Sequence, residues 1–309
     1  MAIVAEEFRV SATNVSPALV VKGERVQAPN STGSEPPVTP APAGACDCHH
    51  HIFDPRFPDA NGKPHAIVAT VDDYLLFRRR LGLSRSIVIA ASTDRDDNRC
   101  VLDALDRLGG TSRGVAIARP GISDAALDEL HAHGVRGLRF YLGKGDIPTP
   151  EELKVFGQRA HKRNWHLQIV ASREGHQVSE WERQLAALPC RIVIDHIGYA
   201  MQPIAADDPD VQAMLRLLQN RRTYMKLSGV YITSKLGFPA YADVDALAKQ
   251  LIAAAPDRML WGTDWPHPSV RGHEPDGAQL FDQITRWAPD EALRRQILVN
   301  NPQELYWAD

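Results

Sequence analysis

Acidic and imidazole side chains alternate near residue 50, and this pattern is the clearest sign of chemistry in the sequence. Residues 46–54 read Cys-Asp-Cys-His-His-His-Ile-Phe-Asp. Successive side chains of a β-strand point to opposite faces, so a strand here places Asp47, His49 and His51 on one face. Burying an acid and two imidazoles requires polar partners. We therefore interpret the stretch as the first strand of a catalytic barrel, rather than a histidine-rich surface loop, and the apolar residues that follow favour this interpretation.

Three later strands also end in ionisable residues. Arg139 and Tyr141 share a face of residues 135–141, His196 follows an apolar strand, and Asp264 follows another in the order Leu-x-Gly-x-Asp. In strand phase, Ile192, Ile194 and His196 fall on one face, and Leu260, Gly262 and Asp264 fall on one face. Asp195 then points away from the interior and is expected to be structural.

These strand ends predict a division of chemical roles. Asp264 is the inward-pointing carboxylate at the mouth, so we expect it to be the general base that activates water. His49, His51 and His196 are expected to polarise a carbonyl group and to stabilise the tetrahedral intermediate. Asp47 is expected to orient a histidine.

The surrounding elements predict an α/β fold, a (β/α)8 TIM barrel over residues 45–309. Apolar strand patterns alternate with helical spacing, and active sites of such barrels lie at the carboxyl ends of the strands. The predicted strands cover residues 46–54, 86–92, 114–118, 135–141, 165–170, 191–196, 224–228 and 259–264. Predicted helices cover residues 72–83, 97–108, 124–133 and 211–219, and one begins at Pro150 after the cap residue Thr149.

Residues 1–44 are predicted to form a proline-rich N-terminal arm that is partly irregular. Residues 30–42 are rich in turn residues and proline, which excludes a helix or a central strand. Residues 9–10 and 19–21 are candidates for a short edge contact, and the sequence leaves this open.

Composition excludes several classes of protein. The net charge of −3 implies no general attraction to nucleic acid or membranes. Four scattered cysteines do not suit a disulfide framework, and Cys46 and Cys48 are expected to pack as small apolar residues under helices. No apolar run reaches membrane-spanning length, and the first residues do not resemble a secretory signal. We expect a cytoplasmic protein with a small-molecule substrate, and the sequence leaves the oligomeric state open.

Three motifs carry a family resemblance. They are Asp47-x-His49-x-His51, His196 within Ile-Asp-His-Ile-Gly, and Asp264 within Trp-Gly-Thr-Asp-Trp-Pro-His. Together they resemble the amidohydrolase superfamily, in its amidohydrolase 2 branch, from about residue 43 to residue 306. Within that branch the chain is similar to the 2-pyrone-4,6-dicarboxylate hydrolase family, and over residues 226–268 also to the D-galactarolactone isomerase family.

The resemblance implies a hydrolase that opens the lactone ring of a carboxylate-bearing substrate, either a pyrone carboxylate or a sugar-acid lactone. A sugar-acid lactone isomerase is the alternative. The isomerase family, however, departs from the full histidine pair and has an amide in place of Asp264. A non-catalytic ligand-binding barrel is the remote alternative.

The resemblance also has implications for whether the active site binds a metal ion. Binuclear members of the superfamily add a lysine or carboxylate on strand four and a histidine on strand five. Here strand four offers Arg139, which stays protonated, and His166 lies at the start of strand five. The pyrone hydrolase family is understood to work without metal, so no cofactor is expected. One zinc ion held by His49, His51, His196 and Asp264 is the alternative.

Substrate-binding residues are expected around the mouth. Arg139 and Lys144 are candidates to bind a carboxylate. Asn98, Tyr231 and His267 are further candidates. Compared with the pyrone hydrolase pattern, the chain has Gly145 near an expected arginine, Val170 near an expected aromatic hydroxyl, and no arginine in residues 230–235. A clamp for two carboxylates is therefore depleted, which favours a sugar-acid lactone with one carboxylate.

Overall fold

Eight parallel strands form one sheet in the computed structural model, which describes residues 20–143, 145–172, 174–270 and 272–308. Around the ring the strands follow chain order, each hydrogen-bonded to the next. They are β3 (Cys46–His50), β4 (Arg85–Ile89), β5 (Ser112–Ala116), β6 (Val135–Tyr141), β7 (His166–Val170), β8 (Arg191–Ile194), β9 (Thr223–Leu227) and β10 (Met259–Trp261). The predicted (β/α)8 barrel is confirmed.

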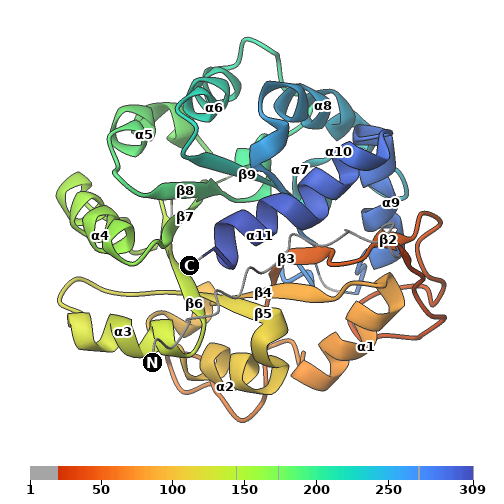
Figure 1. Ribbon diagram of the computed structural model, residues 1–309, viewed down its shortest axis with the longest axis horizontal. Helices are drawn as coiled ribbons and strands as arrows, with labels where there is room; N and C mark the ends of the chain where they lie inside the picture. Colours follow the sequence, from red (N-terminus) through yellow and green to blue (C-terminus); the bar gives the residue numbers. More distant parts are fainter. Residues whose placement is uncertain (1–19, 144, 173, 271, 309) are drawn as a thin grey trace, which may run out of the picture.

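Most of the helices surround the strands on the outside of the ring (Figure 1). The helices of the described residues are α1 (Val71–Leu81), α2 (Arg99–Leu108), α3 (Asp124–Ala132), α4 (Pro150–Lys162), α5 (Gln177–Ala186), α6 (Pro209–Gln219), α7 (Val230–Thr233), α8 (Asp245–Ala254), α9 (Gly277–Trp287), α10 (Glu291–Arg295) and α11 (Asn301–Tyr306). The expected start of α4 is confirmed, because the Thr149 hydroxyl accepts from the backbone N–H of Glu152, and the Glu152 carboxylate accepts in return. In the described part of the chain, no helix has the length and apolarity needed to cross a membrane.

The first and last strands meet through backbone hydrogen bonds beyond the end of β10. The N–H of Asp264 donates to the carbonyl of His49 at 2.8 Å, and the N–H of His51 donates to the carbonyl of Trp265 at 2.8 Å. These two bonds alternate as in a parallel ladder. The barrel therefore closes between the His-x-His segment and the segment that carries Asp264.

The apolar core has two clusters. The outer cluster lies between the strands and the surrounding helices, and the inner cluster lies inside the barrel. The inner cluster draws Cys46, Cys48, Ile87, Ile89, Val115, Val193, Tyr224 and Leu260 from the strands, with Leu305 and Tyr306 from α11. Cys46 and Cys48 thus pack as small apolar residues, as expected, but they face the barrel interior and not the helices around the ring. α11 covers the end of the barrel at which β7 begins, since the ring of Tyr306 lies edge-on to that of His166, 5.3 Å away (Figure 1).

The described part of the arm is held on the barrel by polar contacts. β1 (Val20–Val21) pairs antiparallel with β2 (Ala41–Pro42), so the short contact considered for residues 19–21 forms within the arm itself. The Trp265 indole donates to the Pro29 carbonyl at 2.9 Å. Arg80 on α1 donates to the Glu35 carbonyl at 2.8 Å and pairs with Asp276 at 2.6 Å. Residues 9–10 lie outside the described residues.

Candidate active site

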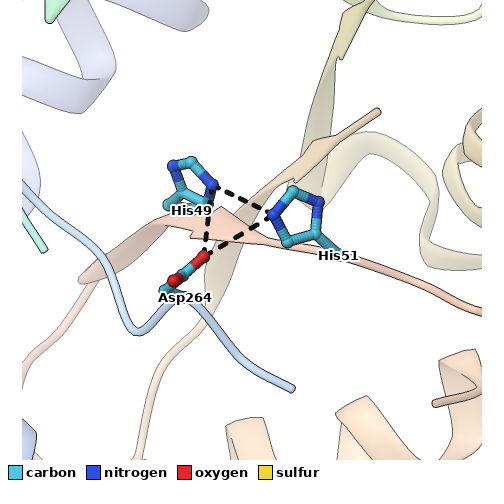
Figure 2. A group of neighbouring side chains, drawn as sticks. All are labelled: His49, His51 and Asp264. Atoms are coloured by element: carbon cyan, nitrogen blue, oxygen red, sulfur yellow. Dashed lines mark hydrogen bonds and ion pairs between the residues drawn. The ribbon is translucent and has the colours of Figure 1, made fainter. Parts of the chain in front are cut away.

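Three imidazoles and one carboxylate oxygen converge at the carboxyl end of the barrel. The Oδ1 atom of Asp264 lies 3.4 Å from His49 Nε2, 3.6 Å from His51 Nε2 and 3.9 Å from His196 Nε2. Figure 2 shows the rings of His49 and His51 turned toward this oxygen. All four side chains are buried. The sequence-based prediction that these residues meet at one point agrees with their placement.

A bulge in β3 places both histidines of the pair inside the barrel. The register with β4 shifts between Asp47 and His50, so Cys48 and His49 both point inward. His50 points outward and stacks on the Tyr74 ring of α1, with centroids 3.6 Å apart. The expectation that Asp47 shares a face with His49 and His51 is therefore wrong.

Asp47 joins β3 to the segment that carries Asp264. Its carboxylate accepts from the backbone N–H of Thr263 at 2.9 Å, from the Thr263 hydroxyl at 2.7 Å and from the Tyr74 hydroxyl at 3.1 Å. It also accepts from the backbone N–H of His49 at 3.1 Å. Asp47 thus supports the position of His49 through the backbone.

The phase of β8 is the reverse of the predicted phase. Val193 belongs to the inner cluster, whereas Ile192 and Ile194 pack in the cluster under the helices. Asp195 therefore points into the barrel, and the expectation that it points away is wrong. His196 still reaches the mouth because its backbone adopts φ 51°, in the left-handed region, which turns the chain.

Asp195 lies at the centre of a buried polar network below His49. Its Oδ1 lies 3.2 Å from Lys226 Nζ on β9 and 3.4 Å from His49 Nδ1. Its Oδ2 accepts from Gln168 on β7 at 2.8 Å and from Arg139 on β6 at 3.2 Å. Sequence reasoning assigned no role to Lys226 or to Gln168. Strand phase could have found Gln168, because it precedes Val170 by two residues in a strand that ends at the mouth.

Hydrogen bonds on the far side of each ring fix the imidazoles. His51 Nδ1 lies 2.8 Å from the Ile89 carbonyl, which only accepts, so Nδ1 carries the proton and Nε2 presents a lone pair. His196 Nδ1 lies 3.0 Å from the Ser228 hydroxyl, which can donate or accept. His49 Nδ1 lies 3.2 Å from Lys226 Nζ.

Burial and charge set the protonation states. Burial raises the pKa of Asp264, but the neighbouring His196, His51 and His49 imidazoles outweigh burial and hold this pKa below its usual range. Burial lowers the pKa of His49, and the Lys226 ammonium lowers it further. Burial also lowers the pKa of His196, although Asp264 opposes the shift. At neutral pH Asp264 is therefore ionised.

A cavity of about 460 Å³ opens above this group. His51, His196 and Asp264 lie in its wall together with Arg139, Tyr141 and Tyr199. Another part of the wall comes from residues 63–67, where His65 pairs with Asp94 at 3.2 Å. The volume lies within the range of small-molecule sites. Sequence reasoning did not identify residues 63–67, because they carry no strand-end signal.

Of the predicted substrate-binding residues, Arg139 and Tyr231 lie at the active site, whereas His267 and Asn98 do not line the cavity. Arg139 lines the cavity, and the hydroxyl of Tyr231 on α7 donates to Oδ2 of Asp264 at 2.6 Å. His267 is buried away from the cavity wall, and its Nδ1 lies 3.0 Å from the Asn30 carbonyl of the arm. Asn98 bonds both the N–H and the carbonyl of Ile117 and does not line the cavity. Lys144 lies outside the described residues.

The donor atoms suit one metal ion by distance but not by the placement of protons. His49, His51 and Asp264 each offer an atom within 4.8 Å of the others. Tetrahedral zinc with bonds of about 2.0–2.1 Å needs ligand atoms roughly 3.3 Å apart, as these are. A histidine must present a lone pair to the metal, however, and His51 does so. To bind zinc through Nε2, neutral His49 would need its proton on Nδ1. Its Nδ1 faces the Lys226 ammonium, which only donates, at 3.2 Å, so this set of residues does not fit zinc as it stands.

The chain is similar to known enzymes along most of its length. It is 36% identical over 281 residues to 2-pyrone-4,6-dicarboxylate hydrolase from Comamonas testosteroni, covering 87% of this chain and 92% of that protein. It is 32% identical over 270 residues to D-galactarolactone isomerase from Agrobacterium fabrum, covering 86% and 91%. The second similarity is thus not confined to residues 226–268.

The fold comparison and the family comparison agree with this. A crystal structure of an Agrobacterium tumefaciens protein without ligand matches 86% of this chain and 96% of that chain, with a TM-score of 0.78 and 31% identity. The amidohydrolase family matches residues 46–307, which span the barrel from its first strand to α11. With its His-x-His strand, its inward-turned His196 and its Asp264 at the closure of the barrel, this chain belongs to the amidohydrolase family.

Proposed function

We propose that this protein is a hydrolase that opens the lactone ring of a carboxylate-bearing small molecule. The observation that carries the proposal is the environment of Asp264 Oδ1. Within the described residues this buried oxygen has no hydrogen-bond partner, and it lies 3.4–3.9 Å from three imidazole nitrogens at the wall of a cavity. A carboxylate oxygen left free beside donors is suited to activating water. Both curated relatives act on cyclic esters by name, which supports a lactone as substrate.

In the proposed reaction, Asp264 Oδ1 takes a proton from water, and the hydroxide attacks the carbonyl carbon of the lactone. The ring C–O bond then breaks, and the ring oxygen receives the proton from Asp264. The product is the open hydroxy acid, or its enol form from a pyrone. In this proposal His49, His51 and His196 surround the reacting carbonyl and the attacking water.

The three imidazole rings then have different hydrogen-bonding roles. With its Nδ1 proton on the Ile89 carbonyl, His51 presents the Nε2 lone pair, so in this proposal it accepts a hydrogen bond from the water and does not donate to the oxyanion. Donation to the oxyanion belongs to His49 and His196. Removing one such donor typically costs about 100- to 1,000-fold in kcat.

Arg139 is the proposed partner of the substrate carboxylate. It lines the cavity, and its Nε has no hydrogen-bond partner among the described residues, although its Nη atoms bond Ala90 and Asp195. One guanidinium with one unpaired N–H suits a single hydrogen bond to one carboxylate. We further propose that the protein works in the cytoplasm, without nucleic acid or membrane partners, as its net charge of −3 favours.

A lactone isomerase is the second candidate, favoured by the 32% identity to D-galactarolactone isomerase. Ring migration needs an attacking hydroxyl of the substrate itself in place of water. The free Oδ1 of Asp264 would serve either nucleophile, so the nucleophile that reaches it decides between the two reactions.

A panel of sugar-acid lactones and pyrone carboxylates separates the candidates. Hydrolysis releases one acid equivalent per turnover, which a pH-stat records, and proton NMR identifies the open acid. Isomerisation gives a new lactone with no acid release. We expect acid release; a ring-migrated product alone would establish the isomerase, and no turnover across the panel would contradict the hydrolase.

A further inference from the structure

We propose that Lys226 keeps the proton of His49 on Nε2, which makes His49 a hydrogen-bond donor to the substrate and prevents it from binding a metal ion through that nitrogen. Lys226 is then a positioning residue that acts through His49. Its side chain is fully buried inside the barrel, directly below His49.

The Lys226 ammonium makes two hydrogen-bond contacts and one ion pair. Nζ donates to Gln168 Oε1 at 2.7 Å, pairs with Asp195 Oδ1 at 3.2 Å and lies 3.2 Å from His49 Nδ1. An ammonium only donates, so the third contact is favourable only if Nδ1 presents its lone pair. In neutral imidazole the proton then lies on Nε2.

Charge balance supports an ammonium at this position. The buried residues around His49 include three carboxylates, Asp47, Asp195 and Asp264, and two cations, Arg139 and Lys226. With neutral imidazoles the negative charges already exceed the positive charges by one. A neutral amine at Lys226 would add a second uncompensated negative charge in the interior, which is costly.

The Nε2 proton points toward His51 and Asp264, which lie in the cavity wall, whereas His49 itself does not line the cavity. His49 Nε2 lies 3.2 Å from His51 Nε2, which presents a lone pair, and 3.4 Å from Asp264 Oδ1. Both neighbours are acceptors, so a donor is the form of His49 that the site accommodates. A metal ion would instead need lone pairs from both imidazoles.

The opposite tautomer becomes favourable once Lys226 is removed. In Lys226→Met, Asp195 Oδ1 loses its ammonium partner and lies 3.4 Å from His49 Nδ1, ready to accept a proton from it. His49 then turns a lone pair toward His51 and Asp264. The variant is expected to bind zinc at least about tenfold more tightly than the parent, the scale of effect that residues behind metal ligands have.

Nitrogen-15 NMR of histidine-labelled protein tests the proposal without any measurement of activity. In the unaltered protein, we expect the long-range spectrum of His49 to show the Nε2–H tautomer, and in Lys226→Met the Nδ1–H tautomer. An Nδ1–H tautomer in the unaltered protein would overturn the proposal, even if no variant folds. Because neither readout involves a lactone, a failed activity screen leaves this test intact.

Equilibrium dialysis against zinc chloride supplies the second readout. Arg139→Met is the matched control, since it removes the other buried cation from Asp195 but leaves the contact between Lys226 and His49. We expect Arg139→Met to keep the Nε2–H tautomer and the weak zinc binding of the parent. Equal zinc affinity in all three proteins, or stoichiometric zinc in the parent, would contradict the proposal.

Discussion

The two oxygens of Asp264 have different neighbours, and this difference defines the chemistry at the scale of single residues. Oδ2 accepts a hydrogen bond from Tyr231 at 2.6 Å, whereas Oδ1 faces the three imidazoles. Tyr231 thus fixes the carboxylate plane and leaves one oxygen free for a water molecule. The depressed pKa of Asp264 keeps that oxygen ionised throughout the neutral range.

Replacing Asp264 with asparagine should abolish this base and retain the fold. We expect Asp264→Asn to lower kcat for lactone hydrolysis by about 100- to 10,000-fold, because an amide accepts no proton from water. Circular dichroism and thermal unfolding report on the fold. Asp72→Asn, at an exposed site on α1, is the control with unchanged kcat. Turnover near the parent value in Asp264→Asn would remove Asp264 from the mechanism.

Metal removal provides a separate test at the same scale. Because His49 is held as a donor, we expect activity to survive dialysis against a chelator and to gain nothing from one equivalent of zinc. Elemental analysis of the dialysed protein, alongside the rate, makes the result quantitative. Loss of turnover on dialysis with recovery on adding zinc would show that the enzyme depends on metal.

At the scale of elements, the closure of the barrel brings the active site together. His49 and His51 hydrogen-bond through their backbones to the segment that carries Asp264, so catalytic geometry and barrel closure depend on the same bonds. Asp47 adds side-chain bonds across the same junction. Gly262 allows this close approach, because a Cβ atom there would lie 2.8 Å from both Cβ and the backbone N of His49.

Gly262→Ala should therefore disturb both stability and activity. The backbone atoms of His49 cannot rotate away, so we expect a loss of about 1–3 kcal/mol in the free energy of unfolding, typical of overpacking. Urea titration measures this loss, and displacement of His49 should lower kcat in the same variant. Gly110→Ala, where no atom lies within 4 Å of the added Cβ, is the matched control. Equal free energies of unfolding in the two variants would show that β3 can shift at this position at little cost in stability.

Sequence patterns predicted the order of the strands and the four converging side chains, because apolar periodicity and strand-end polarity are local signals. They failed where the backbone leaves regular geometry. The bulge in β3 moved Asp47 outward, and the inward phase of Val193 brought Asp195 into the barrel. Sequence patterns gave Lys226 no role, because its partners come from strands distant in sequence.

At the scale of the whole molecule, buried histidines lie at both ends of the barrel. His166 lies at the start of β7 beside Tyr306, and His267 lies beyond Asp264 under the arm. Burial lowers the pKa of His166 to about 3, and the Lys226 ammonium adds to this effect. Burial lowers the pKa of His267 to about 4, although Asp264 opposes the shift. Both rings are therefore neutral in the folded protein near pH 5.

Their burial predicts a loss of stability in mild acid. The unfolded chain binds a proton at each imidazole below about pH 6.5, the ordinary value, whereas the folded protein does not until about pH 4 or 3. Over this window the unfolded state binds more protons, so the free energy of unfolding falls as the pH falls. Each ring contributes a loss of about 2 kcal/mol by pH 5, at 1.36 kcal/mol per pH unit.

Urea titrations between pH 7 and 5 measure the slope, and His267→Gln isolates one contribution. The amide can still donate to the Asn30 carbonyl, which accepts from Nδ1 at 3.0 Å in the parent, but it takes up no proton. We expect the slope of unfolding free energy against pH, averaged over this range, to decrease by about 1 kcal/mol per unit in this variant. The surface variant His161→Gln should retain the parent slope. If both variants gave the parent slope, the folded protein would accommodate a protonated His267, and the contact between arm and barrel would loosen without unfolding the chain.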